Sequence, residues 1–467
     1  MAYRPLSAVV LAAGEGTRMR SRVPKVLHPL CGRPMLLHVI DTLVELPLER
    51  IVVVVGHQAE TVTKTLQNEL VTDIPVEFVE QRVPRGTGDA TSVALTAFSD
   101  AADDDDVIVL SADIPLLRAD TLAVLATEHR LADAAATLLT AELDDPTGYG
   151  RIVRDARGAV QRIVEQSDGN PEELAIREVN PSIYCFRRAF LAPALRRLSP
   201  ENAQGEYYLT DVIEVLRSAG HAVLAVPATD ATETLGVNDR AQLAAAETLL
   251  RERINAEWMR AGVTMADPAR TYIDATVELA EDVRLLPGTV LEGRTSIGAG
   301  SVIGPDSRLV DTMVGEEVTI TYSVTRDAEV GDGAMVGPYA HLRPGTRLAR
   351  GAKIGNFVET KNAEIGEGAK ANHLAYVGDA EVGPRANVGA GTITANYDGR
   401  NKHRTKIGAD AKIGSNTVLV APVEVGDGAT TGAGAVVNRD VPPNALAKGV
   451  PAKIEEDWAD RGEKGES

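Results

Sequence analysis

Residues 407–437 read IGADAKIGSNTVLVAPVEVGDGATTGAGAVV, and this stretch decides the fold of the C-terminal part of the chain. Every sixth position in it is aliphatic or threonine: Ile407, Ile413, Leu419, Val425, Thr431 and Val437. The same period holds upstream, at Val330, Val336, Leu342, Leu348 and Ile354. A short fixed period of this kind is typical of a solenoid. We expect each hexapeptide to form one side of a triangular coil, with its periodic residue buried against the neighbouring coils.

Glycine often follows the periodic residue, as in Ile407-Gly408 and Ile413-Gly414. We interpret these glycines as corner residues, because glycine accepts backbone conformations that other residues resist. The period breaks between Val388 and Ile407, which predicts a loop over residues 391–405. Loops on a regular scaffold are frequent carriers of function.

The N-terminal part has a different pattern. Between residues 7 and 235, short β-branched runs alternate with helical stretches, which predicts a mostly parallel sheet covered by helices. Continuous apolar runs favour strands buried on both faces. The predicted strands are Ala8–Leu11, Ile51–Val55, Val76–Val79 and Val107–Leu110. The acidic run Asp103 to Asp106 is interpreted as a solvated loop before a strand.

A helix is predicted to connect the two parts. Asn238 and Asp239 form a helix-start signal, and Leu243, Leu250, Ile254 and Trp258 then recur at helical spacing. The predicted domains are residues 1–237, a linker helix over 238–262, a solenoid over 263–455 and a disordered tail over 456–467. The fold class is therefore α/β followed by all-β.

Composition limits the classes of partner. The 467 residues carry a net charge of −19, which disfavours binding to nucleic acid and to anionic membranes. No apolar run reaches the length of about 18 residues that a transmembrane helix needs. The two cysteines, Cys31 and Cys185, are too few for a disulfide framework and suit a reducing, cytoplasmic compartment.

A phosphate-binding turn is predicted at the start of the chain. Residues 11–19 read LAAGEGTRM directly after the first predicted strand, and Pro24 and Lys25 follow. A glycine-rich turn exposes backbone N–H groups to phosphate oxygens, while Arg18 and Lys25 add positive charge. The spacing excludes the dinucleotide motif G-x-G-x-x-G, and no G-K-[ST] closes the turn as in a P-loop.

The combined string G-x-G-T-R-M with P-K resembles the signature of the sugar-nucleotide pyrophosphorylases. The resemblance implies a Rossmann-like nucleotidyltransferase domain in which Asp113 and Asn238 hold Mg²⁺ and Arg18 and Lys25 act on the phosphates. Ala112 departs from the glycine of many relatives, and Pro181-Ser182 replaces a common Thr-Gly or Ala-Gly pair. The residues that the resemblance assigns to UTP and the nucleotide sugar are Leu11, Ala12, Ala13, Gly14, Lys25, Gln81, Gly86, Thr87, Ser111, Ala112, Asp113, Gly150, Glu165, Asn180 and Asn238.

The solenoid also carries a set of polar residues. Arg343, Lys361, His373 and Tyr376 fall on neighbouring repeats, where a solenoid that only oligomerises needs no such set. An imidazole with an unperturbed pKa of about 6.5 can accept a proton near neutral pH, which makes His373 a candidate general base.

Together the two sets resemble the bifunctional N-acetylglucosamine-1-phosphate uridylyltransferase and glucosamine-1-phosphate N-acetyltransferase family, from about residue 7 to about 447. The resemblance implies a left-handed parallel β-helix, a homotrimer, and direct acetyl transfer from acetyl-CoA without an acyl-enzyme. It assigns Arg343, Lys361, Tyr376 and Asn387 to glucosamine 1-phosphate. It assigns to acetyl-CoA the residues Ala390, Asn396, Tyr397, Ser415 and Ala433. Lys448 stands near the position where relatives often have a coenzyme-A-binding arginine.

Two other interpretations remain open at the level of sequence. A monofunctional sugar-1-phosphate nucleotidyltransferase would use the solenoid only to oligomerise, and predicts no organised polar set on the coils. A catalytically silent regulatory subunit would predict loss of Arg18, Lys25 or Asp113, and all three are present.

Overall fold

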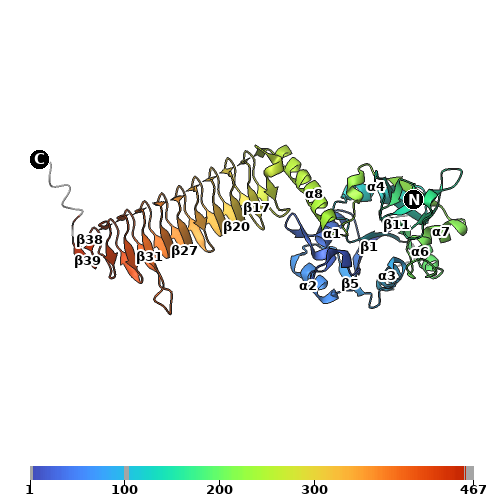
Figure 1. Ribbon diagram of the computed structural model, residues 1–467, viewed down its shortest axis with the longest axis horizontal. Helices are drawn as coiled ribbons and strands as arrows, with labels where there is room; N and C mark the ends of the chain where they lie inside the picture. Colours follow the sequence, from blue (N-terminus) through green and yellow to red (C-terminus); the bar gives the residue numbers. More distant parts are fainter. Residues whose placement is uncertain (1–3, 99–104, 457, 459–467) are drawn as a thin grey trace. The chain divides into compact units, whose positions relative to one another are not determined.

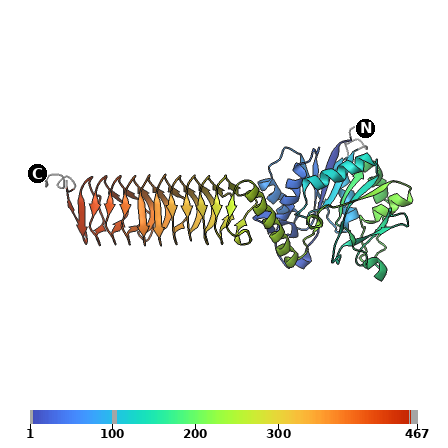
Figure 2. The ribbon, with the colours of Figure 1, turned by 90° about the horizontal axis from the view of Figure 1, so that it is seen from above.

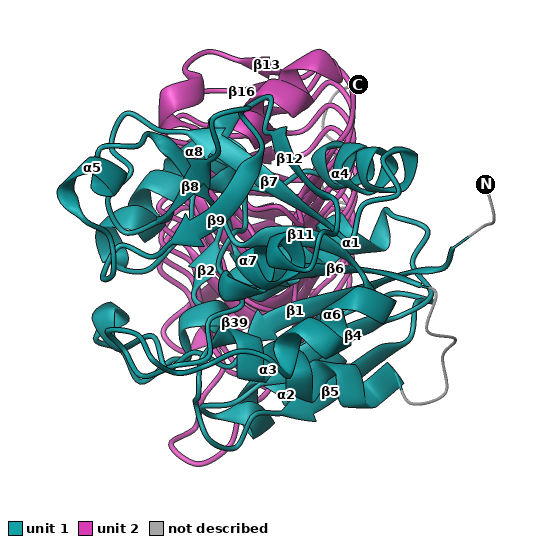
Figure 3. Cartoon of the chain, turned by 90° about the vertical axis from the view of Figure 1, so that its right-hand side faces the viewer, with its two compact units in different colours: residues 1–250 teal, residues 251–467 magenta. Residues whose placement is uncertain are grey.

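The computed structural model describes residues 4–98, 105–456 and 458. Contacts divide the chain into two compact units, Met1–Leu250 and Arg251–Ser467, which Figure 3 colours teal and magenta. Each unit is described by itself. The predicted tail over residues 456–467 lies outside the described residues except at positions 456 and 458.

Unit 1 is built on a ten-stranded sheet of order β5-β4-β1-β6-β11-β7-β10-β8-β9, with β12 paired to β7. The four predicted strands are confirmed as β1, β4, β5 and β6. Only β5 departs from the expected burial on both faces, because it lies at the edge of the sheet and is half-buried. The strands of the sheet are β1 (Leu6–Ala12), β4 (Ile51–Val55), β5 (Val76–Glu80), β6 (Asp106–Ser111), β7 (Ala136–Glu142), β8 (Gly150–Arg154), β9 (Val160–Val164), β10 (Glu178–Asn180), β11 (Ile183–Arg187) and β12 (Val223–Pro227).

The prediction of a mostly parallel sheet is right for one half only. Strands β5, β4, β1 and β6 are parallel, whereas β11, β10, β8 and β9 pair antiparallel with their neighbours. Within this segment, β8 and β9 form an antiparallel pair through a short connection, and a parallel pair would need a longer crossover. A separate pair, β2 (Pro29–Leu30) and β3 (Arg33–Pro34), lies before the first helix.

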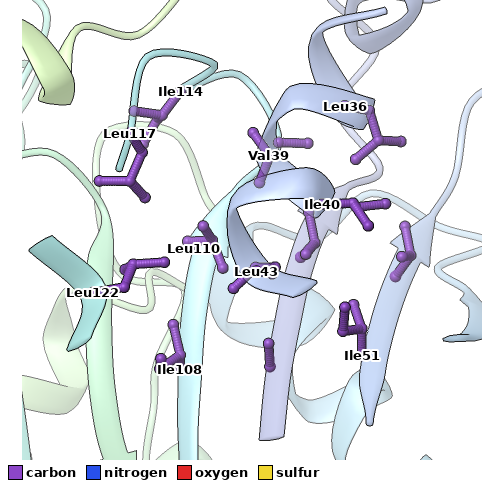
Figure 4. Packing of buried hydrophobic residues seen from close by; sticks show 14 of the residues in the cluster. Leu36, Val39, Ile40, Leu43, Ile51, Ile108, Leu110, Ile114, Leu117 and Leu122 are labelled. Carbon is purple, nitrogen blue, oxygen red and sulfur yellow. The ribbon is translucent and has the colours of Figure 1, made fainter. Parts of the chain in front are cut away.

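Helices cover both faces of the sheet. Figure 4 shows one face, where Leu36, Ile40 and Leu43 of the first helix pack over apolar side chains of β4 and β6. A second buried cluster lies on the other face and includes Phe98 and Tyr184. The helices of unit 1 are α1 (Met35–Val44), α2 (Ala59–Glu69), α3 (Thr87–Ala94), α4 (Ala119–Leu131), α5 (Pro171–Leu174), α6 (Arg188–Leu195) and α7 (Asp211–Ser218).

The prediction of a solvated acidic loop before β6 is wrong for its last two residues. Asp105 and Asp106 are buried, because each meets an arginine. Arg130 Nε donates to Asp106 Oδ2 at 2.9 Å, and Asp105 pairs with Arg188. Asp103 and Asp104 lie outside the described residues.

Helix α8 (Arg240–Arg260) spans the division between the units and matches the predicted helix to within two residues at each end. Of its four predicted apolar positions, Leu250 and Ile254 are buried and Leu243 and Trp258 are half-buried.

Unit 2 is the left-handed parallel β-helix that the family resemblance implies, and its short strands stack as successive rungs in Figures 1 and 2. All six periodic residues from Ile407 to Val437 are buried. One side of the coils is a 12-stranded sheet: β13 (Thr264–Met265), β16 (Arg284–Leu285), β19 (Val302–Ile303), β21 (Thr319–Ile320), β23 (Met335–Val336), β26 (Lys353–Asn356), β28 (Lys370–His373), β30 (Asn387–Val388), β33 (Lys412–Ile413), β36 (Thr430–Thr431), β38 (Leu446–Gly449) and β39 (Ala452–Glu455).

The other two sides form one 15-stranded sheet, because several seven-residue strands continue through a corner. Its strands are β14 (Tyr272–Ile273), β15 (Glu278–Leu279), β17 (Val290–Glu292), β18 (Ser296–Ile297), β20 (Arg308–Val314), β22 (Val324–Val330), β24 (His341–Leu342), β25 (Thr346–Leu348), β27 (Glu359–Ile365), β29 (Tyr376–Val382), β31 (Ile393–Ala395), β32 (Thr405–Ile407), β34 (Val418–Val420), β35 (Val423–Val425) and β37 (Val436–Val437).

The glycines after periodic residues serve a different purpose from the one expected. Gly408 and Gly414 do not adopt a positive φ. Instead, a Cβ on Gly414 would lie 2.5 Å from the carbonyl oxygen of Thr431, so these glycines allow the backbones of successive coils to approach. The left-handed positions of the coils are taken by other glycines, such as Gly428 and Gly434, and by Asp and Asn, which tolerate this conformation.

The predicted loop over residues 391–405 is shorter in the structure. Ile393–Ala395 pair with β34 and Thr405 begins β32, which leaves residues 396–404 outside the strands of the coils. Thr392 and Thr394 are buried in the positions that an aliphatic residue takes elsewhere. A repeat pattern that counts only aliphatic residues therefore misses the coil that contains Thr392 and Thr394.

Candidate active sites

The first candidate site lies at the carboxyl ends of β1, β5 and β6. A cavity of about 500 Å³ opens there, at the edge of a parallel sheet where α/β proteins commonly bind ligands. Ten of the predicted nucleotide-site residues line it: Leu11, Ala12, Ala13, Gly14, Lys25, Gln81, Gly86, Thr87, Ser111 and Asp113.

Gly16 explains how the turn after β1 holds Lys25. Its φ is +61°, a left-handed conformation, and a Cβ at this position would overlap the Lys25 side chain. The turn therefore packs directly against Lys25 and leads its ammonium group toward the ends of β1 and β6. Asp113 follows β6 there.

Lys25, Asp113 and Asn238 meet at one point, although they are far apart in the sequence. Lys25 Nζ donates to Asp113 Oδ2 and, at 2.8 Å, to Asn238 Oδ1. Arg18 Nη2 also donates to Asn238 Oδ1, at 2.8 Å. A carboxylate oxygen and an amide oxygen thus converge on one cation. Such oxygens suit Mg²⁺, which commonly completes its coordination with phosphate and water.

Within residues 4–98, 105–456 and 458, no three His, Cys, Asp or Glu side chains gather in a way that could hold a metal ion. The pair of oxygens on Asp113 and Asn238 is smaller than such a cluster. It fits a metal ion that is bound together with a phosphorylated substrate.

A smaller cavity of about 210 Å³ adjoins the first, because Leu11, Thr87, Ser111 and Glu206 line both. The predicted sugar residue Glu165 lines this second cavity. Gly150 lies beside it, since a Cβ at Gly150 would come within 3.6 Å of Glu165 Oε2.

Two predicted residues are buried next to the site and do not line either cavity. Ala112 is fully buried. Asn180 is also buried, and its Nδ2 donates to Tyr184 Oη at 2.7 Å. Tyr184 itself lines the smaller cavity.

The segment from residue 204 to 210 was missed at the sequence level. Glu206, Tyr208 and Thr210 line the smaller cavity, and Thr210 Oγ1 donates to Glu165 Oε1 at 3.0 Å. Gly86 lets this segment pass, because a Cβ there would lie 2.6 Å from the Tyr207 carbonyl oxygen. Polar and aromatic residues crowded directly before a helix are the signal that could have indicated it.

The smaller cavity has an acidic wall. Burial raises the pKa of Glu165, and the hydrogen bond from Thr210 opposes this effect. Burial, with the nearby charges of Glu214 and Asp168, raises the pKa of Asp211 to about 6. Glu165 and Glu206 thus place carboxyl groups on the wall of this cavity, whereas Asp211 does not line it.

The second candidate site lies on the coils of unit 2. Arg343 N donates to the Thr360 carbonyl oxygen, which places Arg343 beside Lys361 on the next coil. Arg343 Nη1 donates to Glu359 Oε1 at 2.7 Å, and this contact raises the pKa of Arg343. Tyr376 lies one coil further along, opposite Glu359.

The loop over residues 396–404 approaches the same residues. Lys402 lies close to Lys361, whose ammonium group lowers the pKa of Lys402. Asn396 Nδ2 lies 3.3 Å from Tyr376 Oη. Two ammonium groups this close are typical of a binding site for an anion.

His373 and Asn387 lie on a different sheet from Arg343 and Lys361. They belong to β28 and β30, on the 12-stranded side. His373 is exposed and shares a coil with Tyr376. Within one chain, the residues predicted for acetyl transfer are thus divided between two sides of the coils.

Three of the five residues predicted for acetyl-CoA stack along one corner of the coils, whereas Asn396 and Tyr397 lie in the loop over residues 396–404. Asn416 N donates to the Ala390 carbonyl oxygen at 2.7 Å, and Gly434 N to the Ser415 carbonyl oxygen at 2.8 Å. Ala390, Ser415 and Ala433 therefore lie on successive coils. Lys448 lies beyond them, against Gly432, and pairs with Glu455.

Neither cysteine belongs to these sites. Cys31 and Cys185 are buried, and burial raises the pKa of the Cys185 thiol. None of the helices described here is both long and apolar enough to cross a membrane.

Comparisons with known proteins agree with this division. Residues 8–261 match the family model of the MobA-like NTP transferase domain, and residues 404–439 match that of the bacterial transferase hexapeptide, six repeats. The chain thus combines a nucleotidyltransferase domain with an acyltransferase-type repeat domain, and it is an enzyme.

Several curated relatives are similar along nearly their whole length. The Bifunctional protein GlmU of Brevibacillus brevis is 50% identical over 442 residues, which cover 95% of this chain and 94% of the relative. That of Streptomyces coelicolor is 50% identical over 447 residues, covering 96% and 92%. That of Heliobacterium modesticaldum is 47% identical over 460 residues, covering 98% and 99%. The chain described here belongs to the family of bifunctional GlmU proteins.

Proposed function

We propose that the chain makes UDP-N-acetylglucosamine in two steps, one in each unit. The coils transfer an acetyl group from acetyl-CoA to glucosamine 1-phosphate. Unit 1 then transfers a uridylyl group from UTP to N-acetylglucosamine 1-phosphate and releases pyrophosphate. The observation that carries this proposal is that one chain holds two organised polar sites, one at the sheet edge and one on the coils.

The geometry of unit 1 suits nucleotidyl transfer. A cavity of about 500 Å³ for the nucleotide adjoins one of about 210 Å³ for the sugar, and Lys25 lies at the end of the larger one. A sugar 1-phosphate is already a charged nucleophile, so the protein needs no general base. Arg18 and Lys25 orient the phosphates and offset the charge that develops on pyrophosphate.

Asp113 and Asn238 would hold Mg²⁺ when substrate is bound. The ion would supply further charge neutralisation at the α-phosphate. In the nucleotide cavity, we assign base recognition to Gln81, whose Nε2 is oriented by Asp89 Oδ2 at 2.8 Å.

The coils suit attack by an amine on a thioester. Arg343, Lys361 and Lys402 supply positive charge for the sugar phosphate, and Tyr376 lies beneath them. The substrate amine must lose a proton to attack, and we assign His373 to accept it. The new C–N bond forms as the thioester C–S bond breaks, and coenzyme A leaves as the thiol.

A homotrimer would bring the two halves of the acetyl site together across neighbouring chains. In support, an exposed aromatic row lies along one corner of the coils: the rings of Tyr322 and Tyr339 are 5.6 Å apart, and those of Tyr339 and Phe357 are 5.4 Å apart. Tyr339 and Phe357 are 55% and 58% exposed, which is unusual for stacked aromatic rings on a surface that only water covers.

We assign residues 1–237 to uridylyl transfer, 238–262 to the linker and 263–455 to acetyl transfer, and we propose a cytoplasmic enzyme. The test is one assay with glucosamine 1-phosphate, acetyl-CoA, UTP and Mg²⁺. UDP-N-acetylglucosamine should form, and omitting acetyl-CoA should stop its formation. If a UDP-sugar forms from N-acetylglucosamine 1-phosphate but glucosamine 1-phosphate is not acetylated, the assignment of unit 1 is supported and that of unit 2 is refuted.

A further inference from the structure

Three side chains stack as a ladder at the corner of the coils that directly follows Lys361. Asn362 and Asp379 occupy the same left-handed corner of successive coils, with φ of +45° and +47°. The strand register continues to the next coil, where Tyr376 pairs with Ile393, and so places Asn396 after Asp379. The ladder is therefore Asn362, Asp379 and Asn396, and its middle rung is a carboxylate that is only 8% exposed.

Asp379 holds an amide on either side. Asn362 Nδ2 donates to Asp379 Oδ1 at 2.8 Å, and Asn396 Nδ2 donates to Asp379 Oδ2 at 2.5 Å. Both carboxylate oxygens are thus engaged by side chains that adjoin the site. Lys361 precedes Asn362, and the loop over residues 396–404 starts at Asn396.

An ionised carboxylate accepts hydrogen bonds and cannot donate them. An asparagine amide can present either its NH₂ group or its oxygen, so its orientation depends on its neighbour. Asp379 therefore forces both asparagines to present their NH₂ groups toward it. The oxygen of Asn362 faces away, toward Gly345 on the preceding coil, where a Cβ would come within 3.4 Å of it.

We propose that Asp379 is a positioning residue for acetyl transfer, which fixes Asn396 so that its amide oxygen faces the acetyl donor. The proposal rests on the acetyl transfer assigned above. The same orientation turns Asn396 Nδ2 toward Tyr376 Oη at 3.3 Å. Asp379 thereby helps to align Asn396, assigned to acetyl-CoA, with Tyr376, assigned to glucosamine 1-phosphate.

The charge of Asp379 has a second consequence for the same site. Lys361 lowers the pKa of Lys402, and the charge of Asp379 acts in the opposite direction. The buried negative charge of Asp379 thus offsets part of the repulsion that Lys402 experiences from Lys361. The site is thus prepared for an anion before one arrives.

The test begins with Asp379→Asn, which keeps the shape but lets the ladder hydrogen-bond in either direction. Acetyl transfer should lose about tenfold in kcat/KM for acetyl-CoA, the effect of losing one charge-assisted hydrogen bond. The loss should fall mainly on the KM for acetyl-CoA, and uridylyl transfer should be unchanged. Asp311→Asn is the matched control: Asp311 has a φ of +47° at an equivalent corner, and its carboxylate accepts from Arg294 N at 3.0 Å.

A double variant separates orientation from stability. In Asn362→Asp with Asp379→Asn, the new carboxylate at 362 again accepts only, so the amide at 379 must donate to it and turn its oxygen to Asn396. Acetyl transfer should recover most of the lost kcat/KM. The proposal would be overturned if Asp379→Asn kept its full activity, or if the folded double variant recovered none of it. It would also be overturned if both variants failed to fold. Absence of acetyl transfer in the unaltered enzyme would instead overturn the proposed function.

Discussion

At the scale of single residues, one cation organises the nucleotidyl site. Lys25 Nζ contacts Asp113 Oδ2 and Asn238 Oδ1, and Asn238 also accepts from Arg18. These residues come from three separate parts of unit 1. Their convergence makes the site sensitive to the loss of any one member.

Lys25→Ala and Asp113→Ala should each lower uridylyl transfer by roughly 10²–10³-fold, because both act on charge that shifts during the reaction. Pyrophosphate release from UTP and N-acetylglucosamine 1-phosphate at saturating Mg²⁺ measures the effect. Acetyl transfer in the same preparations serves as the folding control. Turnover close to that of the unaltered enzyme would refute these two assignments.

The sequence indicates individual site residues where a local motif contains them. The turn at residues 11–19 and the end of β6 are contiguous strings, so their place at one sheet edge follows from the strand order. Tyr208 and Thr210 reach the site through a close approach to Gly86, which no local string encodes. Likewise, the ladder at Asp379 depends on the register between coils, and a six-residue period does not reveal side-chain hydrogen bonds.

At the scale of elements, the first turn of α7 carries an unfavourable charge. Burial, Glu214 and Asp168 raise the pKa of Asp211 to about 6 in the folded protein. The folded state thus holds this proton more tightly than the unfolded chain, where an Asp has a pKa of about 3.9. The free energy of unfolding therefore falls as the pH rises from about 4 to 6, because Asp211 loses its proton. At higher pH this loss of stability persists unchanged.

Asp211→Asn should remove this cost. Because Asp211 is only partly buried, we expect a gain of about 1 kcal/mol at pH 7.5, which corresponds to roughly 2–4 °C in the unfolding midpoint of unit 1. Calorimetry of the full chain at several pH values measures it. The gain should disappear near pH 4, and an equal gain at pH 4 and pH 7.5 would contradict the titration of Asp211.

Glycine in the coils is required by contact between elements. A Cβ on Gly414 would press on the Thr431 carbonyl oxygen and the Gly432 backbone of the next coil. Gly414→Val should therefore destabilise the coils by several kcal/mol, through overpacking and lost backbone hydrogen bonds. Gly434→Ala is the control, because a Cβ there meets nothing within 4 Å, although its φ of +71° imposes a smaller strain. Equal unfolding midpoints for the two variants would refute this explanation.

At the scale of the whole molecule, the two units have independent cores. The coils bury their periodic residues against one another, and the sheet of unit 1 has a cluster on each face. A fragment from residue 263 onward should therefore fold alone and form a soluble trimer that acetylates glucosamine 1-phosphate. Light scattering measures its mass, and a monomeric fragment that still acetylates would contradict a site shared between chains.

The central claim is that this chain carries two separable activities. His373 lies on the coils, whereas Arg18 lies at the sheet edge of unit 1. Loss of a general base typically costs roughly 10²–10⁴-fold, and it should leave a site in another unit unaffected.

The most direct test assays both reactions in His373→Ala and Arg18→Ala. His373→Ala should lose acetylation of glucosamine 1-phosphate and still make UDP-N-acetylglucosamine from supplied N-acetylglucosamine 1-phosphate, and Arg18→Ala should do the reverse. Loss of both activities in a His373→Ala protein that keeps its circular dichroism spectrum and its mass would contradict the two-site account.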